Sequence, residues 1–412
     1  MKALFAGALA AALAILIAGG GEAAAGFRRG ATLVEFFSFP ATQGEGAARV
    51  YEDPPFPRAA DKLASFDFDA LRRIGFDHMR LPVDLGPMMR GSEATRSQVL
   101  AQLRTVIAAL RHSGLSVLVT LIPPSLQHEL PETYLDGLTG AKFRLYFDNV
   151  LRVASVLAAL KDEAVALEPM NEPQDRCRKL LGTDWTEYQK HMVERIRSVA
   201  PELPLFLTGG CWSNIEGIEL LDSDIVRDPR NYISVHFYYP FLFTHQSATW
   251  TMPHMAGVIG VPYPASAGAE DATLALTRER FKNVALKEGT DRAQALRKAE
   301  GEIRRYFAER QGPDDVEKWM QRIAAWQQRE RVPANRILFT EFGAMKQTIE
   351  GVEIDKASRT RWFYDVSSAI ERRGWGWTVY VLRDDPFGLY QREGDRYPDP
   401  ALLHALRLKP VD

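Results

Sequence analysis

A short polar motif, Asn171-Glu172-Pro173, follows an apolar stretch and has the residue types that acid/base chemistry uses. A regular strand sends successive side chains to opposite faces, so an adjacent amide and carboxylate share a site only if the strand ends there. Pro173 donates no backbone hydrogen bond and fits such an end. The same tripeptide also occurs by chance in loops, so the motif needs partners elsewhere in the chain.

Further polar side chains lie at the ends of other predicted strands: Arg80, His236, Tyr238 and Glu341. Two carboxylates that face each other across a neutral substrate are what glycoside cleavage requires. One must be protonated to release the leaving oxygen, and the other must be ionised to attack or to activate water. A cation beside one carboxylate would favour its ionised form, whereas burial without a cation would favour the protonated form of the other.

Strands and helices alternate along the chain. Eight strands separated by helices predict a parallel (β/α)8 TIM barrel, in which catalytic residues sit at the carboxyl ends of the strands. The competing architecture is an open doubly wound sheet, but it needs a glycine-rich phosphate turn after the first strand, and none is present. The strands are expected over residues 32–37, 77–83, 116–121, 165–170, 205–208, 232–237, 337–340 and 378–382.

One segment between two predicted strands is too long for this alternation of strands and helices. Residues 240–335 lie between the sixth and seventh predicted strands, where one helix would suffice. The segment opens with aromatic residues and continues with charged helical stretches. We therefore expect a single catalytic domain over residues 26–412, with this segment as an insertion on the catalytic face.

Four motifs together carry a family resemblance. Each motif alone is weak, but their order and their positions at predicted strand ends make a strong signal. The chain from about Gly30 to Leu382, apart from the insertion, resembles glycoside hydrolase family 5, the cellulase-like retaining enzymes. The motifs are Arg80-Leu81-Pro82-Val83, Asn171-Glu172-Pro173, His236-Phe237-Tyr238 and Thr340-Glu341-Phe342-Gly343.

The resemblance implies a role for each motif. Glu172 would be the acid/base and Glu341 the nucleophile, with the two carboxyl groups roughly 5–5.5 Å apart. Asn171 would bind the 2-hydroxyl of the sugar. No metal and no cofactor are implied. Arg80 would lie beside Glu341, Tyr238 would hydrogen-bond it, and His236 would line the same site.

Two of these residues have an ordinary alternative. Arg80 could be a surface ion-pair partner, and His236 could be a histidine of the core. Tyr238, two positions after His236, points to the same side of the strand and favours the site interpretation. The side chain of Glu168 is expected on the same face of the strand as that of Glu172, but deeper in the strand. We therefore leave Glu168 out of the predicted catalytic residues.

Aromatic residues could form sugar platforms. At the eighth strand, where the family usually places a tryptophan, this chain has Tyr380. Trp212, at the end of the fifth strand, and Trp250, in the insertion, could stack on the apolar faces of sugar rings. Either tryptophan could instead be a large core residue.

The chain has two cysteines, Cys177 after the fourth strand and Cys211 at the end of the fifth. These strands are neighbours in a barrel, so a disulfide is possible. It would close a loop of roughly 34 residues and stabilise the fold by about 3–4 kcal/mol in the chain-entropy model. Two free thiols are the alternative.

The first 25 residues have the pattern of a cleavable secretory signal. Lys2 precedes an apolar run that ends in small residues, and the run is short for a membrane span. An uncleaved anchor is the alternative. We expect a secreted or periplasmic protein without stable membrane association after cleavage, and the net charge of −2 gives no indication of nucleic-acid binding.

These observations predict a secreted retaining hydrolase of β-linked glucan-like poly- or oligosaccharides. Mannan or another β-linked exopolysaccharide is an alternative substrate. A barrel that binds glycan without cleaving it is a second alternative, although both carboxylates are present. Metal-dependent hydrolysis would need clustered histidines and aspartates, and the first strand has no His-x-His pattern.

Overall fold

The computed structural model describes residues 26–124, 126, 131–173, 185–383, 386–392 and 394–410. The predicted signal segment, residues 1–25, lies outside them, so its cleavage stays a prediction. Among the described residues, no helix has both the length and the apolar character needed to cross a membrane.

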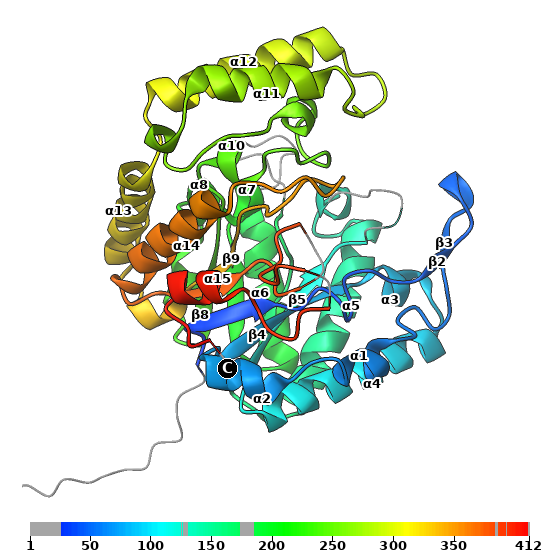
Figure 1. Ribbon diagram of the computed structural model, residues 1–412. Helices are drawn as coiled ribbons and strands as arrows, with labels where there is room; N and C mark the ends of the chain where they lie inside the picture. Colours follow the sequence, from blue (N-terminus) through cyan, green and yellow to red (C-terminus); the bar gives the residue numbers. More distant parts are fainter. Residues whose placement is uncertain are drawn as a thin grey trace, which may run out of the picture.

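The core of the molecule is a closed parallel barrel, which confirms the predicted (β/α)8 architecture (Figure 1). Its strands follow one another in chain order around the barrel, and the last one, β10, pairs with the first, β1. Most strand residues are buried on both faces, as a sheet covered by helices requires. The strands are β1 (Arg29–Thr32), β4 (His78–Asp84), β5 (Ser116–Ile122), β6 (Val165–Glu168), β7 (Leu205–Thr208), β8 (Asn231–Phe237), β9 (Ile337–Phe342) and β10 (Gly376–Val379).

Amphipathic helices cover the outside of the barrel. In α4 (Glu93–His112), Val99, Leu103 and Leu110 are buried at helical spacing. The Ser92 side chain accepts a hydrogen bond from the Thr95 backbone N–H and caps the start of this helix. The other helices of the ring include α2 (Phe68–Ile74), α5 (Ala141–Ala158), α6 (Trp185–Val199), α8 (Ile215–Ile218), α9 (Ser223–Arg227), α13 (Pro313–Glu330), α14 (Lys356–Glu371) and α15 (Pro400–Ala405).

The first and last barrel strands begin earlier than their sequence predicts. β1 ends at Thr32, where the predicted strand begins, and β10 begins at Gly376, two residues before the predicted start. Both strands contain a glycine in a crowded position: a side chain at Gly30 would collide with the His78 ring, and one at Gly376 with the Phe27 backbone oxygen. Glycine is a poor strand former by propensity, so close packing rather than apolar pattern sets these two strands.

The segment between β8 and β9 adds a helical hairpin to the barrel. It contains α10 (Phe241–Thr244), η4 (Pro253–Gly257), η5 (Ala265–Ala267), α11 (Glu270–Phe281) and α12 (Arg292–Ala308). Figure 1 shows α11 and α12 side by side at one end of the molecule, beyond the barrel. The last helix of the segment, α13, packs against α8, α9 and α14 on the outside of the barrel, as an ordinary barrel helix does.

Candidate active site

The nucleophile candidate, Glu341, lies near the carboxyl end of β9 and is held by three neighbours. Arg80 donates from Nη1 to Glu341 Oε1 at 2.5 Å, and the Tyr238 hydroxyl donates to Oε2 at 2.8 Å. The ring nitrogen Nδ1 of His236 lies 3.5 Å from Oε2. Burial alone would raise the pKa of this carboxyl, but the charges of His236 and Arg80 and the two hydrogen bonds lower it below its ordinary value. Glu341 is therefore held ionised.

The carboxyl group of the acid candidate, Glu172, is biased toward its protonated form, in contrast to that of Glu341. Burial, reinforced by the charge of Glu341, raises the pKa of its carboxyl against the opposing effects of His236 and Arg80. Its Oε1 lies 2.8 Å from Nδ1 of His236, and its side chain is 28% exposed, so a substrate can reach it. An oxygen of Glu172, an oxygen of Glu341 and a ring nitrogen of His236 all lie within 4.8 Å of one another. The structure thus pairs an acid and an ionised carboxylate.

The end of β6 explains how Asn171 and Glu172 share one site. The strand stops at Glu168, and Glu172 has a φ of 42°, in the left-handed region that non-glycine residues rarely adopt. Asn171 accepts from Arg80 Nη2 at 2.6 Å through its amide oxygen. Because a guanidinium only donates, the amide nitrogen of Asn171 points away from Arg80. The expected break in the strand is present.

Glu168 is a residue of the site that the sequence argument left out. It is fully buried, and its Oε2 accepts from Arg80 Nη2 at 3.1 Å and from the Thr120 hydroxyl at 2.6 Å. Its Oε1 accepts from the Ser234 hydroxyl at 2.5 Å. One buried guanidinium therefore spans Glu168 and Glu341, and their charges raise the pKa of Arg80 above its ordinary value despite burial. The alternative of Arg80 as a surface ion-pair partner is wrong.

His236 and Tyr238 complete the polar cluster. Burial would lower the pKa of His236, but the charge of Glu341 and the hydrogen bond to Glu172 outweigh it and raise the pKa. Burial and the charge of Glu341 raise the pKa of Tyr238, which keeps its hydroxyl a neutral donor. His236 is buried, yet it contacts both carboxylates and is more than a core residue.

This cluster could in principle offer ligands to a metal ion, since two carboxylates and an imidazole are close together. The Arg80 guanidinium 2.5 Å from Glu341 works against a second cation at that carboxylate. These three side chains therefore fit a proton donor paired with an ionised carboxylate better than they fit a metal site.

The predicted aromatic platforms lie at two places around the cluster. Tyr380, after β10, has its ring 5.6 Å from the ring of Phe387. Phe387 also lies 6.0 Å from Tyr238 and 6.3 Å from Trp250, and the sequence argument missed it because it belongs to a loop of no regular pattern. Trp212 donates its backbone N–H to the Pro173 carbonyl, next to Glu172, at 3.3 Å. Trp212 and Trp250 are 43% and 47% exposed, so neither is a core residue.

Trp212 sits in a strained turn. Cys211, Trp212 and Ser213 all have left-handed φ values, of 56°, 57° and 59°. Each such residue costs about 1–2 kcal/mol, and strain of this kind clusters at functional sites. Cys211 is buried and has no free thiol, while Cys177 lies outside the described residues, so the bridge between them stays a prediction.

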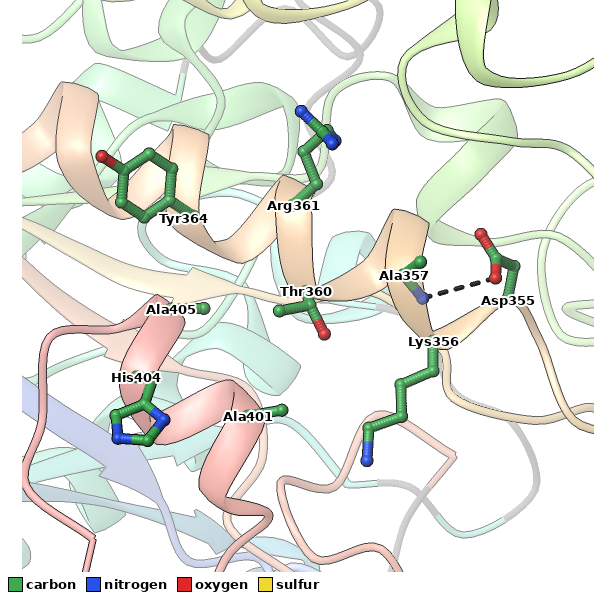
Figure 2. Close-up of a pocket in the computed structure, with 9 residues that line it drawn as sticks. All are labelled: Asp355, Lys356, Ala357, Thr360, Arg361, Tyr364, Ala401, His404 and Ala405. Carbon is green, nitrogen blue, oxygen red and sulfur yellow. Dashed lines mark hydrogen bonds between the residues drawn. The ribbon is translucent and has the colours of Figure 1, made fainter.

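A separate hollow of 860 Å³ lies between α14 and α15 and shares no residue with this cluster (Figure 2). Asp355, at its edge, accepts from the Ala357 backbone N–H and so serves as a helix cap. Lys356 pairs with Asp399 at 2.5 Å. Asp355, the carboxylate among the residues that line this hollow, thus has a structural role.

The family model for Cellulase (glycosyl hydrolase family 5) matches residues 64–385 of the chain. Among curated proteins, Cellodextrinase A of Ruminococcus flavefaciens is 27% identical over 191 residues, which cover 45% of this chain and 54% of that protein. Endoglucanase C of Acetivibrio thermocellus is 24% identical over 206 residues, covering 48% and 57%. The chain thus spans about half the length of the curated relatives it matches.

Solved structures resemble the chain over most of its length. A hyperthermophilic endo-β-1,4-glucanase, solved in complex with substrate, has a TM-score of 0.62 at 20% identity, covering 92% of this chain and 97% of that one. The endoglucanase Cel5A of Thermotoga maritima has a TM-score of 0.60 at 19% identity, with the same coverage. At these identities the likeness shows that the barrel fold is shared.

We predict that Glu168→Gln destabilises the fold by on the order of 3 kcal/mol, because it removes a charge that compensates the buried Arg80. Chemical denaturation of the variant and the wild type measures the difference. The exposed Glu288 provides the matched control, since Glu288→Gln should change the free energy of unfolding by less than about 0.5 kcal/mol. Equal stability of Glu168→Gln and the wild type would contradict the proposed charge balance.

Proposed function

The chain belongs to glycosyl hydrolase family 5, as the match over residues 64–385 shows, and from this premise we propose that it hydrolyses β-linked glucans with retention of configuration. One observation carries the proposal. Within one cluster, Glu341 is held ionised beside Arg80 and Glu172 is biased toward its protonated form. Double displacement requires this combination of a nucleophile and an acid.

In the first step, a Glu341 oxygen attacks the anomeric carbon while Glu172 gives its proton to the glycosidic oxygen. The carbon–oxygen bond breaks, the leaving sugar departs as an alcohol, and a glycosyl ester forms on Glu341. In the second step, Glu172 takes a proton from water, which attacks the same carbon and releases Glu341. Two inversions restore the original configuration.

The separation of the carboxylates supports retention. Retaining enzymes hold their two carboxyl groups about 5–5.5 Å apart, whereas inverting enzymes hold them about 6.5–9.5 Å apart to admit a water molecule. Oxygens of Glu172 and Glu341 come within 4.8 Å of each other. Arg80 donates to Oε1 of Glu341 and Tyr238 donates to Oε2, and these two bonds fix the orientation of the carboxylate.

A β-glucan is the substrate that the curated relatives favour, since their names are cellodextrinase and endoglucanase. A mannan is the second candidate, because the Cel5A neighbour has been solved with cellobiose and with mannotriose. We also propose export from the cytoplasm, supported by the composition of residues 1–25. The mass of the chain recovered from outside the cytoplasm tests export, since signal removal shortens the protein.

The sugar product should first carry the β configuration at its new reducing end. Proton NMR of the early products from soluble β-glucan, with mannan in parallel, follows the anomeric signal before mutarotation. Folded Glu172→Gln and Glu341→Gln variants should lose about 10²-fold or more in kcat on the polysaccharide. An α product at early times would refute double displacement, and full activity of either variant would refute the assigned roles.

The pH profile should be bell-shaped, with its limbs set by these two carboxyls. Activity falls at low pH as Glu341 gains a proton, and its lowered pKa moves this limb below the ordinary glutamate value of 4.5. Activity falls at high pH as Glu172 loses its proton, and its raised pKa moves this limb above that value. Profiles of kcat/KM with an aryl glycoside of good leaving ability measure both limbs.

Glu172→Gln is the variant that assigns the alkaline limb. With an activated leaving group, this variant should keep the acid limb and lose the alkaline one. An alkaline limb that survives in Glu172→Gln would assign it to another group, such as His236, whose pKa is also raised.

A further inference from the structure

The hollow between α14 and α15 has the size of a ligand site, although it shares no residue with the polar cluster. Its volume of 860 Å³ lies within the range of about 300–1,000 Å³ that is usual for ligand pockets. Small apolar side chains line it: Ala357 of α14, and Ala401 and Ala405 of α15. Figure 2 shows Thr360 and Lys356 pointing from α14 toward α15. This combination suits a ligand that has both apolar faces and hydroxyl groups.

An exposed aromatic ring lies at one end of the hollow. Tyr364 is 52% exposed and lines this end together with His404. The guanidinium of Arg407 lies 5.9 Å from the centre of the Tyr364 ring, and Arg407 donates to Glu371 at 3.0 Å. A ring supported on one side loses little conformational entropy when a ligand covers the rest of it. Tyr364 can therefore stack on the apolar face of a sugar ring.

The charged groups along the hollow favour a neutral ligand. Lys356 pairs with Asp399 at 2.5 Å, and Asp355 accepts from two backbone N–H groups at the start of α14. An ionic ligand would have to compete with these partners, whereas a neutral ligand leaves them in place. The Thr360 hydroxyl and the His404 ring are side chains of the hollow that can hydrogen-bond to sugar hydroxyls.

The helix that lines the hollow is anchored to the loops of the active site. Arg359, buried on α14, donates to the carbonyls of Ala344, Phe387 and Gly388 at distances of 2.8, 2.8 and 2.9 Å. The ring of Phe387 lies 6.0 Å from that of Tyr238, whose hydroxyl bonds the nucleophile candidate. Because α14 follows β9, it begins at the catalytic face of the barrel. The hollow, at the first turns of α14, therefore adjoins that face.

We propose that this hollow is a second glycan-binding site, which holds a stretch of the same neutral β-glucan chain that is cleaved at the polar cluster. Tyr364 stacks on one sugar ring, and Thr360 and His404 bind hydroxyl groups. A polymer held at the hollow has a raised effective concentration at the cleft, so the site favours long chains over short ones. The choice of ligand rests on the proposed function.

Binding is measured first without turnover. Native electrophoresis of Glu341→Gln through gels that contain soluble β-glucan gives the apparent affinity from the retardation. Addition of Tyr364→Ala should weaken this affinity by about three- to tenfold, the loss expected for one stacking contact. Tyr364→Phe keeps the aromatic face and should retain most of the affinity. Equal retardation with and without Tyr364→Ala, or no retardation of either protein, would overturn the proposal.

A second variant fills the hollow. Ala357→Glu places a larger side chain there, and an acidic residue in the first turn of a helix favours folding. It should weaken binding about as much as Tyr364→Ala does. Ala293→Glu is the matched control, because Ala293 is exposed and lies two residues after the capping Asp291 of α12, as Ala357 does after the capping Asp355 of α14. An equal loss in Ala293→Glu would assign the effect to charge alone and overturn the proposal.

Kinetics separates this proposal from the hydrolytic function. In the chain with Glu341 intact, Tyr364→Ala should raise the ratio of KM for the polymer to KM for nitrophenyl β-cellobioside by about three- to tenfold. Equal changes in both KM values would indicate a disturbed cleft and would overturn the proposal. If the protein hydrolyses no glucan, the proposed function fails, but weaker retardation by β-glucan in Tyr364→Ala and Ala357→Glu would still support the second site.

Discussion

The buried guanidinium of Arg80 is the constraint on which the site depends. A cation removed from water is stable only if charged and hydrogen-bonding partners replace the solvent, and Glu168, Glu341 and Asn171 do so. These partners come from β6, β9 and the segment after β6, so Arg80 on β4 fixes three parts of the barrel mouth relative to one another. Together with His236 and Tyr238, Arg80 also lowers the pKa of Glu341 and so favours its ionised form. The same guanidinium thus fixes the geometry of the site and contributes to its charge.

The backbone conformation at two strand ends also positions side chains of the site. Left-handed φ values at Glu172 and at Trp212 turn two strand ends so that an acid and an indole become neighbours. Neither residue is a glycine, so both conformations cost free energy that the surrounding packing must supply. The hydrogen bond from Trp212 to Pro173 joins the two turns. Strain is therefore concentrated beside the proton donor, where position matters most.

The carboxylates, the polar residues around them and the barrel could be predicted from sequence because strand ends converge at one face. Glu168 could not be assigned to the site from the sequence. Its position deep in the strand indicates a role in the site only once Arg80 is known to be buried and to need a second anionic partner. Phe387 was missed because its place depends on loop contacts from Arg359, which no periodic pattern encodes. β1 and β10 were misplaced because Gly30 and Gly376 are set by close packing rather than by strand propensity.

The central claim is that Glu341, held by Arg80, becomes covalently bonded to the sugar. A 2-deoxy-2-fluoro glycoside with a good leaving group slows the second step and lets the ester accumulate. Mass spectrometry of the digested protein then locates the label. We predict one label per chain, on the peptide that contains Glu341, and none in Glu341→Gln. A label on Glu172, or none in an enzyme that turns over the normal substrate, would contradict the account.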